Sequence, residues 1–308
     1  MDAQTYGTGA DMAAREPRNI FVSAPDGLRL HVRLWGLRTA PGLPVVCLPG
    51  LARTTSDVEP LAAGLTDSIP APRAVYALDY RGRGHSDYDR DPANYSFAVE
   101  LADLVAVLTA LDIGRAVFIG TSRGGLLTMM LGSVRPGAIA GVVLNDIGPV
   151  IDPKGLVRIK GYVGKLPQPT SFEDAATVLR RLFGAQFPAL ADDDWLAFAH
   201  RTFYERDGRL VPNYDPRLAE TLRSVDVERP LPALWNEFDA LKDIPVLVVR
   251  GANSDILASA TVKAMRARRK DMRTIEIPDQ GHAPLLAEPA TIARIQAFIE
   301  SCEPAPHA

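Results

Sequence analysis

Ser122 is the residue whose surroundings most favour catalysis, because it stands at the centre of the Gly-Thr-Ser-Arg-Gly motif at residues 120–124. The apolar run Ala116–Ile119 precedes this motif and a helical stretch follows it, so the serine is expected at a sharp turn from strand to helix. The two glycines lack a Cβ atom and let neighbouring backbone approach the turn. Such a turn exposes the hydroxyl and directs the first helical amides at the reaction centre, which favours a nucleophilic serine. A glycine- and serine-rich turn without chemistry is the alternative.

A base is needed because a serine hydroxyl is a weak nucleophile by itself. His282 is the strongest candidate among the five histidines, since it follows the apolar run Arg273–Ile277. It is therefore expected at the C-terminal end of a strand, where sheets of this kind bind their ligands. A surface histidine without a catalytic role is the alternative.

A carboxylate is also needed, to fix the tautomer of the base and to stabilise its protonated form. Asp255 follows the apolar run Ile244–Val249 and is the favoured acid. With Asp255, the chain order Ser, Asp, His places the three groups on successive strand-end loops around one cleft. Two alternatives remain: Asp255 could cap a following helix, and Asp146 could be the acid, because it lies one strand closer to Ser122.

The elements that must hold these residues are short apolar runs alternating with helical stretches. Continuous apolar runs of this length are typical of strands buried on both faces of a parallel sheet, and alternation with helices predicts a doubly wound α/β fold. An Asp-Gly pair within residues 20–35 predicts a hairpin before this pattern. The predicted strands are Val45–Leu48, Ala74–Leu78, Ala116–Ile119, Ile139–Leu144, Ile244–Val249 and Arg273–Ile277, and the predicted helices are Ser56–Leu65, Ser96–Leu111, Gly125–Val134, Ser259–Arg269 and Pro289–Glu300.

The interval from residue 149 to residue 239 interrupts this alternation, because it shows no clear buried strand. It is rich in aromatic residues and contains helical stretches such as Phe172–Leu182 and Asp192–Tyr204. We interpret it as a helical insertion covering the C-terminal edge of the sheet, with Trp195 and Phe198 as candidate pocket residues. A helical extension with an aromatic core is the alternative. The predicted organisation is an arm at 1–18, core at 19–148, insertion at 149–239, core at 240–302 and a tail at 303–308.

The overall composition limits the other classes of function. The chain has 308 residues, 47% of them hydrophobic, and a formal net charge of −3, so neither nucleic acid nor an anionic membrane is an expected partner. Residues 1–18 lack the pattern of a signal peptide. The two cysteines and scattered histidines predict neither a disulfide framework nor a metal site. We expect a cytoplasmic protein that acts on a small molecule with an apolar portion, and a homodimer is compatible with the sequence.

Taken together, these motifs resemble the α/β-hydrolase fold family from about residue 21 to residue 300. The Leu-Pro-Gly-Leu segment at 48–51 is similar to the family's oxyanion loop, so the resemblance implies backbone donors at Leu51 and Arg123. Many members have His-Gly where this chain has Pro-Gly, a change that keeps the amide and loses a side chain. The segment at 79–86 is similar to a structural Asp-x-Arg-Gly-x-Gly-x-Ser turn, which argues against His85 as the base.

The resemblance also implies a mostly parallel eight-stranded sheet with a helical cap, a triad of Ser122, Asp255 and His282, and no cofactor. The chemistry would be acyl transfer through an acyl-enzyme, with a carboxylic ester as the substrate expected first. Hydrolysis of a C–C bond and cofactor-free perhydrolysis use the same residues and remain alternatives. A small-molecule receptor on the same fold is the non-enzymatic alternative. A serine at position 122 argues against the branches of the family that use an aspartate nucleophile, and Arg123 beside it is a further candidate for the pocket.

Overall fold

A large twisted sheet occupies the centre of the molecule, with strand order β1-β2-β4-β3-β5-β6-β9-β10. The computed structural model describes residues 16–66, 72–223, 225–226 and 231–303. The sheet is antiparallel at β1–β2 and β2–β4 and parallel at every other pairing among the described strands. Its strands are β1 (Arg18–Ser23), β2 (Arg29–Trp35), β3 (Val45–Leu48), β4 (Val75–Asp79), β5 (Ala116–Thr121), β6 (Ile139–Asn145), β9 (Val246–Gly251) and β10 (Arg273–Ile277).

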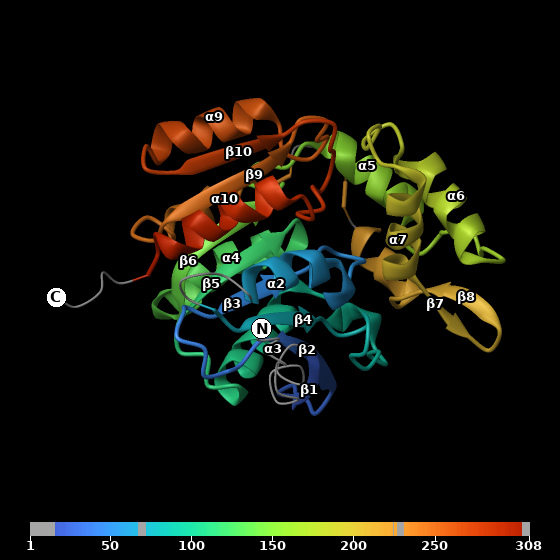
Figure 1. Cartoon of the computed structure of the whole chain (residues 1–308), viewed down its shortest axis with the longest axis horizontal. Helices are drawn as coiled ribbons and strands as arrows, with labels where there is room; N and C mark the ends of the chain where they lie inside the picture. The colour runs from blue at the N-terminus through green and yellow to red at the C-terminus, as the bar shows by residue number, and fades with distance from the viewer. Residues whose placement is uncertain (1–15, 67–71, 224, 227–230, 304–308) are drawn as a thin grey trace, which may run out of the picture.

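Helices cover both faces of this sheet (Figure 1). Residues of α2 (Glu59–Thr66) and α10 (Pro289–Glu300) pack in one apolar cluster with one face of the strands. Residues of α3 (Phe97–Ala110), α4 (Arg123–Val134) and α9 (Ser259–Arg268) pack in a second cluster on the opposite face. Strands β3, β4 and β6 are buried along their whole length, as continuous apolar runs require. The predicted doubly wound α/β fold is therefore confirmed.

The predicted boundaries differ from the observed ones by a few residues. The strand expected at Ile244–Val249 begins at Val246 as β9, and α4 begins at Arg123, two residues earlier than expected. The Asp-Gly hairpin joins β1 to β2, and Gly27 has a φ of +87° in its turn. The predicted arm at 1–18 and tail at 303–308 lie almost wholly outside the described residues.

The interval between β6 and β9 is mainly helical and projects beyond one end of the sheet (Figure 1). Phe183, Trp195 and Phe203 belong to an apolar cluster of its own. The aromatic residues therefore serve in part as the core of this insertion. The sequence did not predict the hairpin of β7 and β8. The elements are α5 (Pro153–Tyr162), α6 (Phe172–Phe183), α7 (Asp192–Thr202), β7 (Phe203–Arg206), β8 (Arg209–Pro212) and α8 (Trp235–Asp239).

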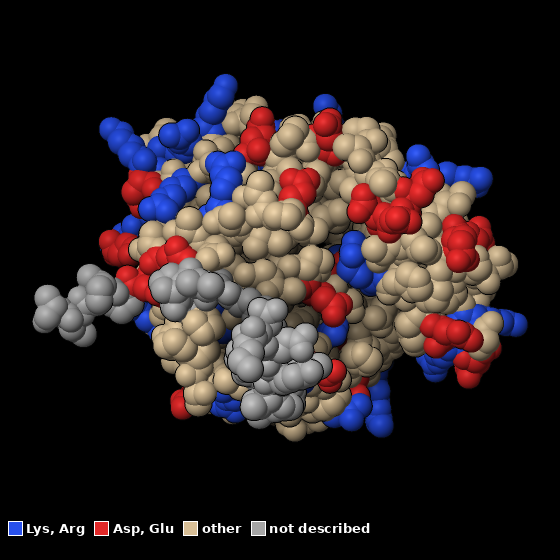
Figure 2. Space-filling model, viewed as in Figure 1, with Lys and Arg blue, Asp and Glu red and all other residues tan. Residues whose placement is uncertain are grey.

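The surface carries basic and acidic side chains side by side on the face seen in Figure 2. A hollow on this face separates the part that holds the large sheet from the insertion, and charged groups of both signs lie at its edge. No helix in the described parts of the chain is long and apolar enough to cross a lipid bilayer. Cys47 and Cys302 are both free thiols.

Candidate active site

Ser122 stands at a strained turn between β5 and α4. Its φ of 52° and ψ of −112° are unusual for a residue with a side chain. Glycines make the turn feasible: a Cβ on Gly124 would lie 2.0 Å from the carbonyl oxygen of Leu48, and one on Gly120 would lie 2.5 Å from that of Gly124. The Ser122 amide donates to the carbonyl oxygen of Asn145 at 3.0 Å, which ties the turn to the end of β6.

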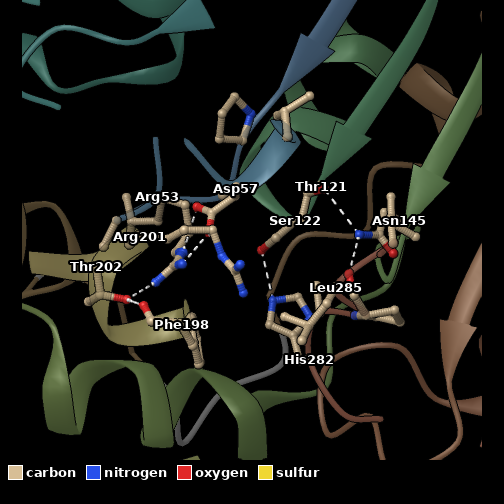
Figure 3. A pocket seen from close by; sticks show the side chains of 18 of the residues that line it. Arg53, Asp57, Thr121, Ser122, Asn145, Phe198, Arg201, Thr202, His282 and Leu285 are labelled. Atoms are coloured by element: carbon tan, nitrogen blue, oxygen red, sulfur yellow. Dashed lines mark hydrogen bonds and ion pairs between the residues drawn. The ribbon is translucent and has the colours of Figure 1, made fainter. Parts of the chain in front are cut away.

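Three side chains form a continuous hydrogen-bonded chain at this turn. The Ser122 hydroxyl lies 2.8 Å from Nε2 of His282, and Nδ1 of His282 lies 2.8 Å from Oδ2 of Asp146 (Figure 3 shows the first contact). An ionised carboxylate only accepts hydrogen bonds, so Nδ1 carries the imidazole proton and donates to Asp146. The unprotonated Nε2 is then free to accept the proton of the Ser122 hydroxyl.

The prediction that Asp255 partners His282 is wrong. Asp255 instead accepts two hydrogen bonds from Arg158, from Nε at 2.7 Å and from Nη2 at 2.9 Å. Burial alone would raise the pKa of Asp255, but the hydrogen bonds and positive charge of Arg158 outweigh burial and lower the pKa. The helix-capping alternative is not observed either, since the residue preceding α9 is Ala258.

Asp146, the alternative acid, is the carboxylate that contacts His282. The order of the strands in the sheet explains this. Asp146 follows β6 directly, and β6 is the neighbour of β5 in the sheet, whereas Asp255 lies four residues beyond the last residue of β9. Besides His282, Asp146 accepts hydrogen bonds from the Gly251 amide at 2.9 Å and the Ser254 hydroxyl at 2.5 Å. Its side chain is completely buried. These donors fix the orientation of the carboxylate and satisfy its oxygens.

The loop that carries His282 is anchored to the same strand end. Asn145, the last residue of β6, donates from Nδ2 to the carbonyl oxygen of Pro284 at 2.9 Å and to the Thr121 hydroxyl at 3.1 Å. The loop therefore spans β9 and lies over β6, which brings His282 between Ser122 and Asp146.

The two predicted oxyanion donors, Leu51 and Arg123, both lie near Ser122 in the fold. Arg123 is the first residue of α4, and Leu51 lines the cavity beside the serine. No hydrogen bond from either backbone amide is present within the described residues. The Arg123 side chain points elsewhere, because it donates to Glu100 at 2.6 Å and stacks over the ring of Phe97. The suggestion that this side chain belongs to the pocket is therefore wrong.

A buried ionic network connects the residues that carry these amides. Glu100 accepts hydrogen bonds from Arg83 at 2.8 Å and from Arg123 at 2.6 Å, and Arg83 also donates from Nε to the Leu51 carbonyl oxygen at 2.9 Å. Glu100 and Arg83 have fully buried side chains. The sequence did not identify Glu100, because a single glutamate within a predicted helix carries no recognisable signal.

A cavity of about 150 Å³ opens beside Ser122 and His282. Phe198 lines it, as predicted, but Trp195 does not, because its ring is buried within the core of the insertion. His85 does not line the cavity either, in agreement with its predicted structural role. Sequence reasoning missed three charged lining residues that come from distant segments: Arg53 and Asp57 follow β3, and Arg201 belongs to α7.

Comparison with known proteins shows the family to which this chain belongs. The sequence model described as "Alpha/beta hydrolase family" matches residues 45–295. The chain belongs to the alpha/beta hydrolase family. This hydrolase is 34% identical over 287 residues to the 3-hydroxybutyrate-oligomer hydrolase of Cupriavidus necator, covering 90% of this chain and 96% of that one.

Further relatives agree with this assignment. The crystal structure of an alpha/beta hydrolase from Novosphingobium aromaticivorans superposes with a TM-score of 0.84 at 40% identity, covering 93% of this hydrolase and 99% of the other chain. The 2-(acetamidomethylene)succinate hydrolase of Mesorhizobium japonicum is 26% identical, covering 94% of this chain and all of the relative. The chain is therefore a hydrolytic enzyme with the α/β-hydrolase fold.

Proposed function

We propose that the enzyme hydrolyses carboxylic esters, with Ser122 as nucleophile, His282 as general base and Asp146 as the acid that orients the histidine. The observation that carries this proposal is the chain of two 2.8 Å contacts from Ser122 through His282 to Asp146. This arrangement allows His282 to take the hydroxyl proton as Ser122 Oγ attacks a carbonyl carbon. Asp146 then stabilises the imidazolium that forms.

The negative charge that develops on the carbonyl oxygen is held by the amides of Leu51 and Arg123. An oxyanion donor of this kind contributes about 3 kcal/mol to the stabilisation of the transition state. Collapse of the tetrahedral intermediate breaks the ester C–O bond. His282 donates its proton to the departing alkoxide, and the acyl group remains on Ser122. A water molecule that His282 deprotonates then attacks the acyl-enzyme and releases the acid, which regenerates the serine.

The size of the cavity and the similarity to a hydrolase named for 3-hydroxybutyrate oligomers support a short substrate. A volume of about 150 Å³ accommodates a group of about the size of benzene. The Cupriavidus necator relative is named for 3-hydroxybutyrate oligomers, whose units are short and joined by ester bonds. We therefore propose oligomers of a short hydroxy acid as substrates, with the insertion at 149–239 acting as a cap over Ser122. This favours the ester over the C–C bond and perhydrolysis alternatives.

Turnover of p-nitrophenyl butyrate by the wild-type protein and by Ser122→Ala tests the proposal. The wild type is expected to release p-nitrophenol at a rate at least 10³-fold above that of the variant, since the nucleophile and its base act as a unit. Equal rates for the two proteins would refute a role for Ser122. Circular dichroism of both proteins shows whether the variant has kept the native fold.

A further inference from the structure

The wall of the cavity carries more positive than negative charge. Arg53, Asp57 and Arg201 line it together, so two guanidinium groups face one carboxylate. Figure 3 shows these three side chains gathered on one side of the cavity, with Ser122 and His282 on the other. A charged group in a largely apolar cavity is unfavourable without a partner. The two guanidinium groups share the single carboxylate of Asp57, and they differ in how completely protein groups bind them.

Arg53 is fully engaged with protein groups. Its guanidinium binds both oxygens of Asp57 and donates from Nη1 to the Thr202 hydroxyl at 2.8 Å. Its planar face also lies 4.5 Å from the centre of the Phe198 ring. These contacts leave Arg53 with the role of fixing Asp57 and connecting the loop after β3 to α7.

Arg201 is held much less completely. Its ion pair with Asp57 joins Nε to Oδ1 over 3.8 Å, which is too long for a hydrogen bond, although only 19% of its side chain is exposed. Within the described ranges its guanidinium donates no hydrogen bond to a protein group. Burial lowers the pKa of Arg201, and the neighbouring Arg53 lowers it further, while Asp57 opposes both effects.

Two other acidic residues act on Arg201 from a greater distance, and both have partners of their own. Glu59 accepts a hydrogen bond from Arg33 at 3.2 Å, and Asp194 accepts one from the Ala191 amide at 2.9 Å. Neither lines the cavity. The donors of Arg201 thus remain available to a group that enters the cavity, and a planar guanidinium matches the two oxygens of a carboxylate.

We propose that Arg201 binds a free carboxylate of the substrate, with Arg53 and Asp57 holding its position, so that the enzyme prefers esters that carry a negatively charged end. This inference rests on the proposed ester hydrolysis at Ser122 and specifies its substrate class. A linear oligomer of a hydroxy acid has such a carboxylate at the end of its alcohol portion. Cleavage next to that end would place the scissile carbonyl at Ser122 and the carboxylate at the opposite wall.

A pair of substrates that differ only in charge tests the inference. The linear dimer of 3-hydroxybutyrate is compared with the same dimer whose terminal carboxylate is replaced by a primary amide, and loss of each is followed by chromatography. The wild type is expected to show a kcat/KM about 10- to 100-fold higher for the acid, the usual effect of one charge-assisted hydrogen-bonded pair. Arg201→Gln should reduce that ratio to within a few-fold, mainly by raising KM for the acid.

Arg181→Gln is the matched control, because Arg181 is an exposed arginine of the same insertion and does not line the cavity. It should keep the wild-type ratio of kcat/KM for the acid to kcat/KM for the amide, and Arg201→Lys should keep part of that preference.

Inhibition of wild-type p-nitrophenyl butyrate turnover by the two dimers gives a second measurement that needs no variant. The acid should inhibit at about 10-fold lower concentration than the amide. Equal inhibition, or an unchanged ratio in Arg201→Gln, would overturn the role of Arg201 while leaving ester hydrolysis intact. Absence of p-nitrophenyl butyrate turnover would instead overturn the proposed function itself.

Discussion

Arg83 donates from Nε to the carbonyl oxygen of Leu51 at 2.9 Å, and this bond joins the buried ionic network to the loop beside Ser122. The same guanidinium is paired with Glu100, which also binds Arg123. The Glu100 carboxylate therefore binds Arg123 directly and Leu51 through Arg83. These are the two residues whose amides are proposed to hold the oxyanion. Glu100 is a positioning residue on this account, since it does not line the cavity.

Replacement of Glu100 by glutamine is predicted to lower both stability and kcat. Two buried arginines would lose their shared counter-charge, and removal of one partner from a buried ion pair costs about 3 kcal/mol or more. We expect a loss of that size in the free energy of unfolding by urea, with kcat for p-nitrophenyl butyrate reduced about 10-fold and KM little changed. Glu205→Gln, at an exposed position in β7, is the control and should match the wild type. An unchanged kcat in a folded Glu100→Gln protein would argue against the positioning role.

Gly124→Ala is predicted to disrupt the turn that presents Ser122. The added Cβ would lie 2.0 Å from the backbone of Leu48, and backbone there cannot move without displacing β3. A loss of about 3 kcal/mol or more in the free energy of unfolding is expected, together with loss of esterase activity. Gly137→Ala makes the matched comparison, because a Cβ at Gly137 would meet nothing within 4 Å. Similar stabilities of the two variants would show that the backbone around Leu48 can move to make room for a Cβ atom at position 124 at little cost in stability.

The ion pair of Asp255 with Arg158 predicts a specific dependence of stability on pH. The pKa of Asp255 is lowered below its ordinary value of 3.8 in the folded protein, so the ionised form favours folding. This contribution is present above the unfolded pKa and is lost as the pH falls through the folded pKa. The difference in unfolding free energy between wild type and Asp255→Asn should therefore be largest near neutral pH and shrink below about pH 4. Asp243→Asn, which removes an exposed carboxylate outside this ion pair, is the control. A difference that grows on acidification would contradict the pairing.

The sequence was sufficient to predict the sheet, the turn at Ser122 and the histidine that lies beside that serine, because each depends on local pattern. Buried strands are continuous apolar runs, and the Gly-x-Ser-x-Gly motif requires its two glycines for steric reasons that the structure confirms. The partner of His282 was predicted incorrectly because two aspartates follow strands that neighbour one another, β6 and β9. Which one meets the histidine depends on how far the His282 loop crosses the sheet.

The charged residues that line the cavity could not be predicted from the sequence either, because they come from segments that are far apart in the chain. Arg53 and Asp57 are separated from Arg201 by about half of the chain, and each is unremarkable in its own segment. Trp195 and Phe198 illustrate the same difficulty at close range. They lie three residues apart on α7, yet only Phe198 reaches the cavity, while Trp195 fills the core of the insertion.

A direct comparison of Asp146→Asn with Asp255→Asn tests whether Asp146 completes the hydrogen-bonded chain of Ser122 and His282. An asparagine at 146 would favour the wrong tautomer of His282, and the corresponding change in serine proteases lowers kcat by about 10⁴-fold. We predict a loss of that order in kcat for p-nitrophenyl butyrate with Asp146→Asn, and a change of only a few-fold with Asp255→Asn. Both proteins must first show a native circular dichroism spectrum. A larger loss of kcat in Asp255→Asn than in Asp146→Asn would show that Asp146 is not the carboxylate that orients His282.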